Sequence, residues 1–119
     1  MPSLEEKSEN AFEALTQLIA HLERCNEYTW AGRFYPIKEA IESFEFDKAI
    51  RLYKLIPMPN MGGFLDLVLC KENGHNVQNY TEANELLGKL QGAVSKSIGN
   101  LRVYIEYQID HELVNVPKV

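Results

Sequence analysis

The chain has 119 residues, of which 45% are hydrophobic and 24% charged, and its formal net charge is −5. This size and composition are typical of one folded domain, here residues 1–119, and exclude an intrinsically disordered chain. The acidic balance and the scattered Lys and Arg residues also exclude a nucleic-acid-binding surface, because such surfaces gather cations against phosphates. The acidity either keeps the protein soluble or attracts a basic protein partner.

The ends and cysteines of the chain predict where it resides. Residues 1–6 read Met-Pro-Ser-Leu-Glu-Glu, so acidic residues stand where a secretory signal has basic ones, and no apolar stretch follows. No apolar run approaches the roughly 18 residues that span a bilayer. Cys25 and Cys70 lie far apart in sequence, which favours two buried thiols over a disulfide. We therefore expect a cytoplasmic protein with no membrane segment.

A first helix is predicted over about residues 4–25. Ser3 followed by Glu6 has the form of a capping box, and apolar residues recur behind it at spacings of three and four. The opposite face of this helix is expected to be solvated. Its acidic members are Glu5, Glu9 and Glu13.

A second helical stripe follows, but Pro36 interrupts it. Proline inside a helix costs about 3 kcal/mol unless it lies in the first turn, so the helix either kinks there or starts near Tyr35 with Trp30 in the approach. Asp47 is expected to cap a short third helix that ends before Pro57.

The segment between the third and last helices has two parts. Residues 57–63 contain two prolines and two glycines, which excludes regular structure. Residues 64–70 are apolar except for Asp66, and Asn73-Gly74 is a hairpin turn signal. These features predict a short β-hairpin near residues 66–79, or else an irregular segment packed over the helices.

Thr81 is expected to cap the last and longest helix, which completes a mainly α, compact bundle of about four helices. Glycine costs about 1 kcal/mol relative to alanine inside a helix, so a strip of small residues here predicts that another backbone passes close by. The alternative is a helix broken near Gly99. The tail, residues 110–119, is expected to be frayed or lightly docked. The strip consists of Gly88, Gly92, Ser95 and Gly99.

No motif points to catalysis, a metal or a cofactor. His21, His75 and His111 lack the further ligands that a zinc site requires at short spacing. Cys70 with His75 supplies at most two ligands, and Cys70 closes an apolar run that predicts burial rather than a reactive thiolate. No glycine-rich phosphate loop is present. We therefore expect a protein that is not an enzyme and binds no metal or cofactor.

Asp66 lies in an apolar run and is expected to be partly buried, so its carboxylate needs a hydrogen-bonding partner. We expect a structural role, in which it accepts bonds from the glycine loop at Gly62 and Gly63 or pairs with Arg33. The functional alternative is contact with a ligand or with a partner's arginine.

Aromatic residues surround Arg33 in the second helical segment, and Trp30 is the largest of them. Such patches are enriched at interface hot spots, and they also supply bulk to small cores. Both interpretations stay open, with Trp30 expected to lean toward the core.

Several segments of the chain form one recognisable pattern: Trp30, residues 61–69 (MGGFLDLVL), residues 73–75 (NGH) and residues 83–87 (ANELL) with Leu90. Together they resemble a family of small uncharacterised bacterial proteins. The family pattern has a tryptophan in an early helix, a central GGMGSFNDL-like segment and a closing helix that opens with Asn-x-x-Leu. The similarity spans about residues 28–91. This chain departs from the pattern at Pro59-Asn60, Gly63 and Leu65.

The resemblance implies a compact helical domain of bacterial origin, of a type that can accompany toxin genes as an immunity or antitoxin protein. Our first hypothesis is a non-enzymatic immunity protein that binds a cognate toxin or effector with a basic cleft. The candidate contacts are Glu5, Glu9, Glu13, Glu39, Glu42, Glu45, Met58, Met61 and Arg33. The residues expected to be structural are Trp30, Gly62, Gly63, Asp66 and Asn84.

Two alternatives remain open. A small-molecule-binding or catalytic domain would gather Asp66, Arg33 and the loop of residues 61–63 in one pocket. A homodimeric scaffold would use the small-residue strip of the last helix.

Overall fold

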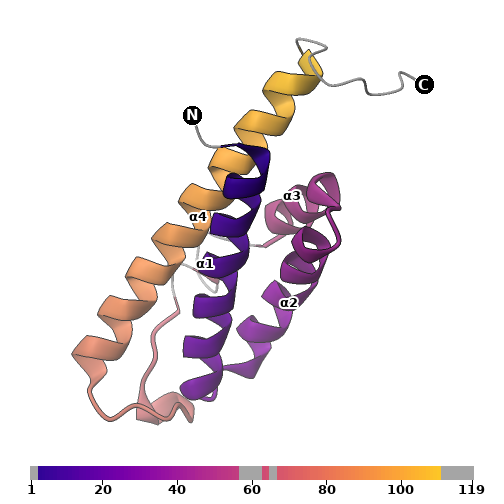
Figure 1. Cartoon of the computed structure of the whole chain (residues 1–119). Coiled ribbons are helices and arrows are strands. Elements are labelled where there is room, and N and C mark those ends of the chain that lie inside the picture. Colours follow the sequence, from indigo (N-terminus) through magenta and orange to yellow (C-terminus); the bar gives the residue numbers. More distant parts are fainter. Residues whose placement is uncertain (1–2, 57–62, 65–66, 111–119) are drawn as a thin grey trace.

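The structure is a computed structural model that describes residues 3–56, 63–64 and 67–110. Its helices are α1 (Leu4–Arg24), α2 (Tyr28–Glu42), α3 (Phe46–Lys54) and α4 (Tyr80–Asp110), and the 3₁₀ turn η2 (Lys71–Asn73) precedes α4. The predicted compact, mainly α bundle of four helices is confirmed. In Figure 1, α1 lies between α4 and α2, and α3 folds back beside the end of α2.

α1 forms where the sequence predicts it. The Ser3 hydroxyl accepts a hydrogen bond of 3.2 Å from the Glu6 N–H, which satisfies one of the free donors of the first turn. The buried face of the helix includes Leu15, Leu18 and Leu22, none of which is exposed. This face packs against both α2 and α4, so α1 is the central helix of the bundle.

α2 begins at Tyr28 and runs without interruption through Pro36, so the predicted start near Tyr35 is wrong. The Glu27 side chain caps the helix by accepting a hydrogen bond of 3.1 Å from the Trp30 N–H. Proline has no N–H, so the Gly32 carbonyl lacks the hydrogen bond that residue 36 would otherwise donate. Both Gly32 and Pro36 are exposed. Water can reach that carbonyl, which lowers the cost of proline at this position.

The start of α3 also differs from the prediction. The helix begins at Phe46, its N-cap residue is Glu45, and Asp47 lies in the first turn instead of capping it. A carboxylate in the first turn still interacts favourably with the helix dipole. The helical pattern was therefore predicted, but the capping residue was not.

The predicted β-hairpin is wrong, because the described residues between α3 and α4 contain no strand. The Asn84 side chain accepts from the Leu69 N–H (2.8 Å) and donates to the Leu69 carbonyl (2.9 Å), which are the backbone groups a paired strand would use. Gly74 has φ +81° and closes η2. The Asn73-Gly74 pair therefore does contain a glycine in the left-handed conformation, but this glycine ends a 3₁₀ turn and does not form a hairpin turn.

α4 is continuous through Gly99, so the predicted break does not occur. Its cap is Asn79, whose side chain accepts a hydrogen bond of 3.1 Å from the Glu82 N–H, and not Thr81. The predicted close backbone is also wrong: a Cβ built on Gly88, Gly92 or Gly99 meets nothing within 4 Å. Gly88 and Gly92 are exposed and Gly99 is half-buried, so these glycines lie on the outer side of α4, away from its core residues.

Phe64 anchors the segment between α3 and α4 in the core. Its ring centroid lies 4.8 Å from that of Phe34 and 5.0 Å from that of Trp30, and the Gln91 amide donates to its carbonyl at 3.1 Å. Aromatic pairs at such distances add to the free energy of area burial. No helix in the described part of the chain is long and apolar enough to cross a membrane.

We expect Gly92→Ala to raise the free energy of unfolding by about 1 kcal/mol, because alanine favours the helix and meets nothing at this position. Gly74→Ala is the contrasting change and should lower the same quantity by about 1 kcal/mol, because φ is positive there. Urea denaturation monitored by circular dichroism measures both. A loss of stability in Gly92→Ala would show that the outer face of α4 is covered in solution.

Candidate functional site

An acidic groove runs between the N-terminal half of α1 and the C-terminal end of α2. Its volume is about 560 Å³, and neither Lys nor Arg lines it. The lining combines four carboxylates with an apolar floor, and the full set is Glu5, Ser8, Glu9, Asn10, Phe12, Glu13, Ile41, Glu42 and Phe44.

The helix repeat places the three glutamates of α1 in a row. Glu5, Glu9 and Glu13 are four residues apart, so they project from one face, and like charges at this spacing weaken a helix by a few tenths of a kcal/mol per pair, about 0.2–0.5. None of the three joins a salt bridge with another described residue, although Glu13 accepts a hydrogen bond of 2.8 Å from Gln17. No cation among the described residues therefore pairs with the row.

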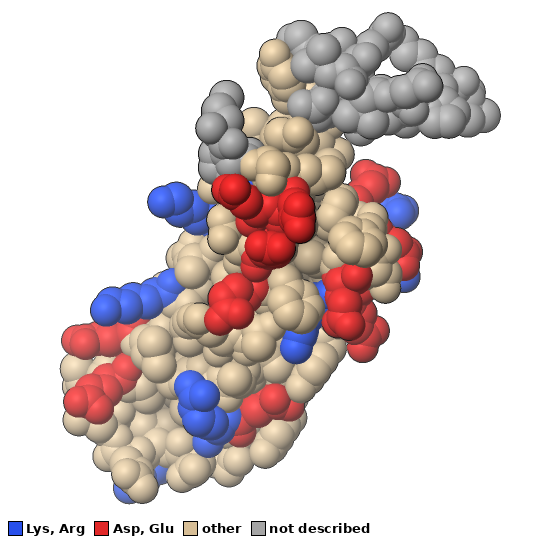
Figure 2. Space-filling view, viewed as in Figure 1, with Lys and Arg blue, Asp and Glu red and all other residues tan. Residues whose placement is uncertain are grey.

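Glu42 adds a fourth carboxylate from the opposite wall. It is the last residue of α2, and the last turn of this helix contains no basic residue. The C-terminus of a helix carries a partial negative charge, so a carboxylate there is unfavourable and a cation would be favourable. Figure 2 shows acidic side chains gathered over α1 and over α2 and α3, with mostly uncharged surface and a basic side chain between the two groups.

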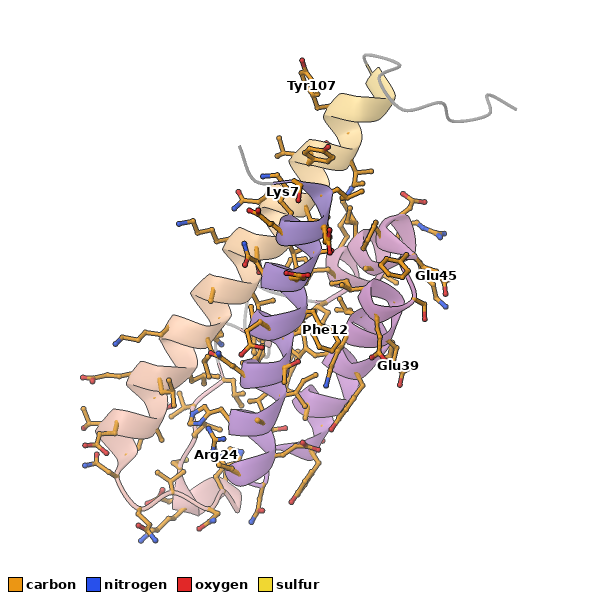
Figure 3. The ribbon with its side chains drawn as sticks, viewed as in Figure 1. Lys7, Phe12, Arg24, Glu39, Glu45 and Tyr107 are labelled. Atoms are coloured by element: carbon orange, nitrogen blue, oxygen red, sulfur yellow. The ribbon has the colours of Figure 1, made fainter. Side chains whose placement is uncertain are left out.

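The floor of the groove is apolar and already faces one cation. The ring of Phe12 is half-buried between α1 and α2 (Figure 3), and Ile41 beside it is buried. The Lys38 ammonium lies 5.2 Å from the centroid of the Phe12 ring. This is within the range of a cation–π interaction.

Phe44 forms the open end of the groove and is the site residue that sequence reasoning missed. It is 77% exposed and has φ +60°, a conformation that usually requires glycine or asparagine. The turn is closed by a 2.8 Å hydrogen bond from the Glu45 N–H to the Ala40 carbonyl, as in other left-handed helix ends. The sequence offered one signal for this residue: the connection between the second and third helices contains a phenylalanine and no glycine.

The other predicted contacts lie elsewhere. Glu39 and Glu45 point away from the groove on the outer side of α2 and α3 (Figure 3), and Glu45 is 3.8 Å from the Lys48 ammonium. Arg33 is exposed, with its guanidinium carbon 4.6 Å from the Trp30 ring centroid. Trp30 is half-buried and packs on the core.

Part of the predicted site falls outside the described residues. This is the case for Met58, Met61, Gly62, Asp66 and the tail from residue 111. The pairing of Asp66 with Arg33, and the pocket that depended on it, stay predictions. Gly63 is described and is buried.

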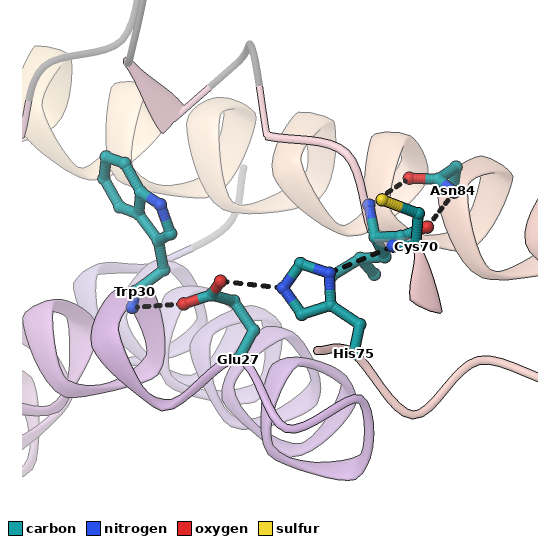
Figure 4. A network of polar contacts seen from close by, with 6 residues as sticks. Glu27, Trp30, Cys70, His75 and Asn84 are labelled. Carbon is teal, nitrogen blue, oxygen red and sulfur yellow. Dashed lines mark hydrogen bonds and ion pairs between the residues drawn. The ribbon is translucent and has the colours of Figure 1, made fainter. Parts of the chain in front are cut away.

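A second polar cluster holds the segment before α4 and explains the Cys70–His75 pair (Figure 4). The His75 Nδ1 accepts a hydrogen bond of 3.0 Å from the backbone N–H of Cys70. Its Nε2 therefore carries the proton and donates to the Glu27 Oε1 at 2.9 Å. Glu27 caps α2 with its other oxygen. The imidazole thus bonds the backbone of Cys70, which indicates a structural role for both residues.

Both cysteines are free thiols, Cys25 buried and Cys70 half-buried. Burial raises the pKa of the Cys25 thiol, and the positive charge of Arg24 partly offsets this, so Cys25 is a poor nucleophile at neutral pH. Within the described residues, no cluster of three His, Cys, Asp or Glu side chains is arranged to hold a metal.

We expect Glu27→Ala to lower the free energy of unfolding by about 2–4 kcal/mol, because it removes a helix cap and leaves the buried His75 N–H without its acceptor. Chemical denaturation measures the loss. Glu23→Ala is the control: its carboxylate accepts only an exposed hydrogen bond from Tyr35, and the change should stay within about 0.5 kcal/mol. Equal losses in the two variants would contradict the role assigned to Glu27.

Comparison with known proteins identifies no relative of this chain. No family model, curated protein or solved structure shows significant similarity to the chain. The resemblance inferred from the sequence motifs therefore stays a prediction, and the functional argument rests on the groove.

Proposed function

We propose that this chain is a non-enzymatic binding protein that neutralises a cationic protein partner, as a bacterial immunity protein neutralises its cognate toxin or effector. The observation that carries the proposal is the acidic groove, whose four carboxylates have no Lys or Arg among the lining residues. Proteins that act on nucleic acids or phosphates place cations in their clefts, and an acidic wall can cover such a cleft.

The arrangement supports both rapid and specific association. Opposite fields steer two proteins together and raise the association rate. α1 is held on two sides by α2 and α4, so the glutamate row is presented on a rigid element. Little conformational entropy is then lost when a partner binds.

The proposed compartment is the bacterial cytoplasm, where an immunity protein would meet its toxin. The two free thiols are compatible with a reducing compartment. A homodimeric scaffold is the second candidate. It is favoured by the outward-facing glycines of α4. Sedimentation equilibrium distinguishes the two, because only the scaffold predicts a dimer of the free chain.

The proposal is tested by co-expressing the tagged chain with the product of its neighbouring gene, with cell survival and complex recovery as the two readouts. We expect Glu9→Lys combined with Glu13→Lys to weaken the complex by about tenfold or more. The main cause should be a lower association rate constant, which no longer rises when the salt concentration is lowered. Surface plasmon resonance at two salt concentrations measures this.

The matched control changes the same number of charges at the other end of the bundle. Glu72→Lys combined with Glu85→Lys alters exposed residues of η2 and α4, and protection and affinity should persist. If the control pair weakens binding as much as the groove pair, the groove is not the binding site. If neither a complex nor protection is found, the immunity function is wrong.

A further inference from the structure

The groove has a chemical character that goes beyond its charge. It joins an acidic rim to two aromatic rings, Phe12 and Phe44. The Lys38 ammonium lies 5.2 Å from the centroid of the Phe12 ring, so Phe12 already has a cation partner within the chain and Phe44 is the other aromatic ring of the lining. An occupant of the groove therefore needs a positive charge that also tolerates contact with an aromatic face.

A role in stabilising the fold does not explain why a phenylalanine occupies position 44. The equivalent turn after α1 uses Asn26, with φ +62°, and asparagine tolerates this conformation well. Phe44 adopts φ +60° and leaves 77% of its surface exposed. Its one ring contact among the described residues is edge-on to Phe46, with centroids 6.1 Å apart. Aromatic residues, phenylalanine included, are enriched in the cores of protein–protein interfaces.

We propose that the groove binds an arginine side chain of the partner protein, with the guanidinium against Phe44 and paired with the glutamates of α1 and α2. This inference deepens the proposed function and rests on it. Arginine is favoured over lysine because its planar guanidinium stacks on aromatic rings and bonds carboxylates through two N–H groups at once. The C-terminal end of α2, next to Phe44, also favours a cation.

The spacing of the glutamates indicates how such a partner segment is arranged. Glu5, Glu9 and Glu13 repeat every four residues, which corresponds to about 6 Å along a helix axis. A partner helix with arginines at the same spacing matches this row. The probe is therefore an alanine-based helical peptide with arginine at every fourth position, and its twin has lysine at the same positions.

Binding of the two peptides to the full chain is measured by calorimetry, and the site is located by amide chemical shifts. We expect the arginine peptide to bind two- to fivefold more tightly than its twin, about what a cation–π contact at an exposed site contributes. Shifts should concentrate in α1 and around residue 44. In Phe44→Ala the preference for arginine should fall, because stacking on the ring is lost and only the pairing with the carboxylates remains, while binding of the lysine peptide changes little.

Two further variants separate binding from folding. Leu55→Ala removes an apolar side chain that is also exposed, at 78%, and should keep the arginine preference. Phe44→Gly should reduce the arginine preference as much as Phe44→Ala does without lowering Tm, because glycine suits the left-handed conformation. Equal binding of the two peptides, or a preference that is undiminished in Phe44→Ala, would overturn the inference.

The outcome for the proposed function is read separately. Protection of cells with no arginine preference would leave the immunity function intact and remove the role of Phe44. A clear arginine preference without protection would establish the docking groove and reject the immunity role.

Discussion

The packing of α1 between α2 and α4 is the constraint on which the rest of the structure depends. Its fully buried leucines remove apolar surface from water on both sides, and burial of such side chains is the main driving force of folding. Because this face is turned inward, the opposite face of the same helix must face solvent. The glutamate row therefore owes its exposure and its rigidity to the core.

Several features of the groove lower the stability of the fold. Carboxylates four residues apart on α1 repel one another, and Glu42 lies at a helix end that disfavours its charge. Phe44 adds a bulky side chain in a conformation that glycine would adopt more easily. Unfavourable features of this kind tend to gather at functional sites, and here they share one groove. That coincidence distinguishes this surface from the scattered charges elsewhere on the chain.

Polar contacts, and not strand pairing, hold the segment before α4. Glu27 caps α2 and accepts from His75, His75 accepts from the backbone of Cys70, and Asn84 bonds both backbone groups of Leu69. Buried polar groups in this network are paired, so each side chain satisfies a donor or acceptor that would otherwise be costly to bury. An irregular segment can therefore cross the helices without forming a sheet.

The sequence by itself determined the helices of the bundle, the cap at Ser3, and the exposure of Glu5, Glu9 and Glu13, because these follow from apolar periodicity and local hydrogen bonding. Only the tertiary structure decided where α2 begins, why Pro36 is tolerated within it, and that residues 67–79 form no hairpin. Each of these depends on a distant partner or on access to solvent: His75 for Glu27, which caps α2, water for the Gly32 carbonyl, and Asn84 for Leu69. The groove belongs to the second class. Its carboxylates are visible in the sequence, but Phe44 joins Glu42 and the α1 row only because α2 packs beside α1.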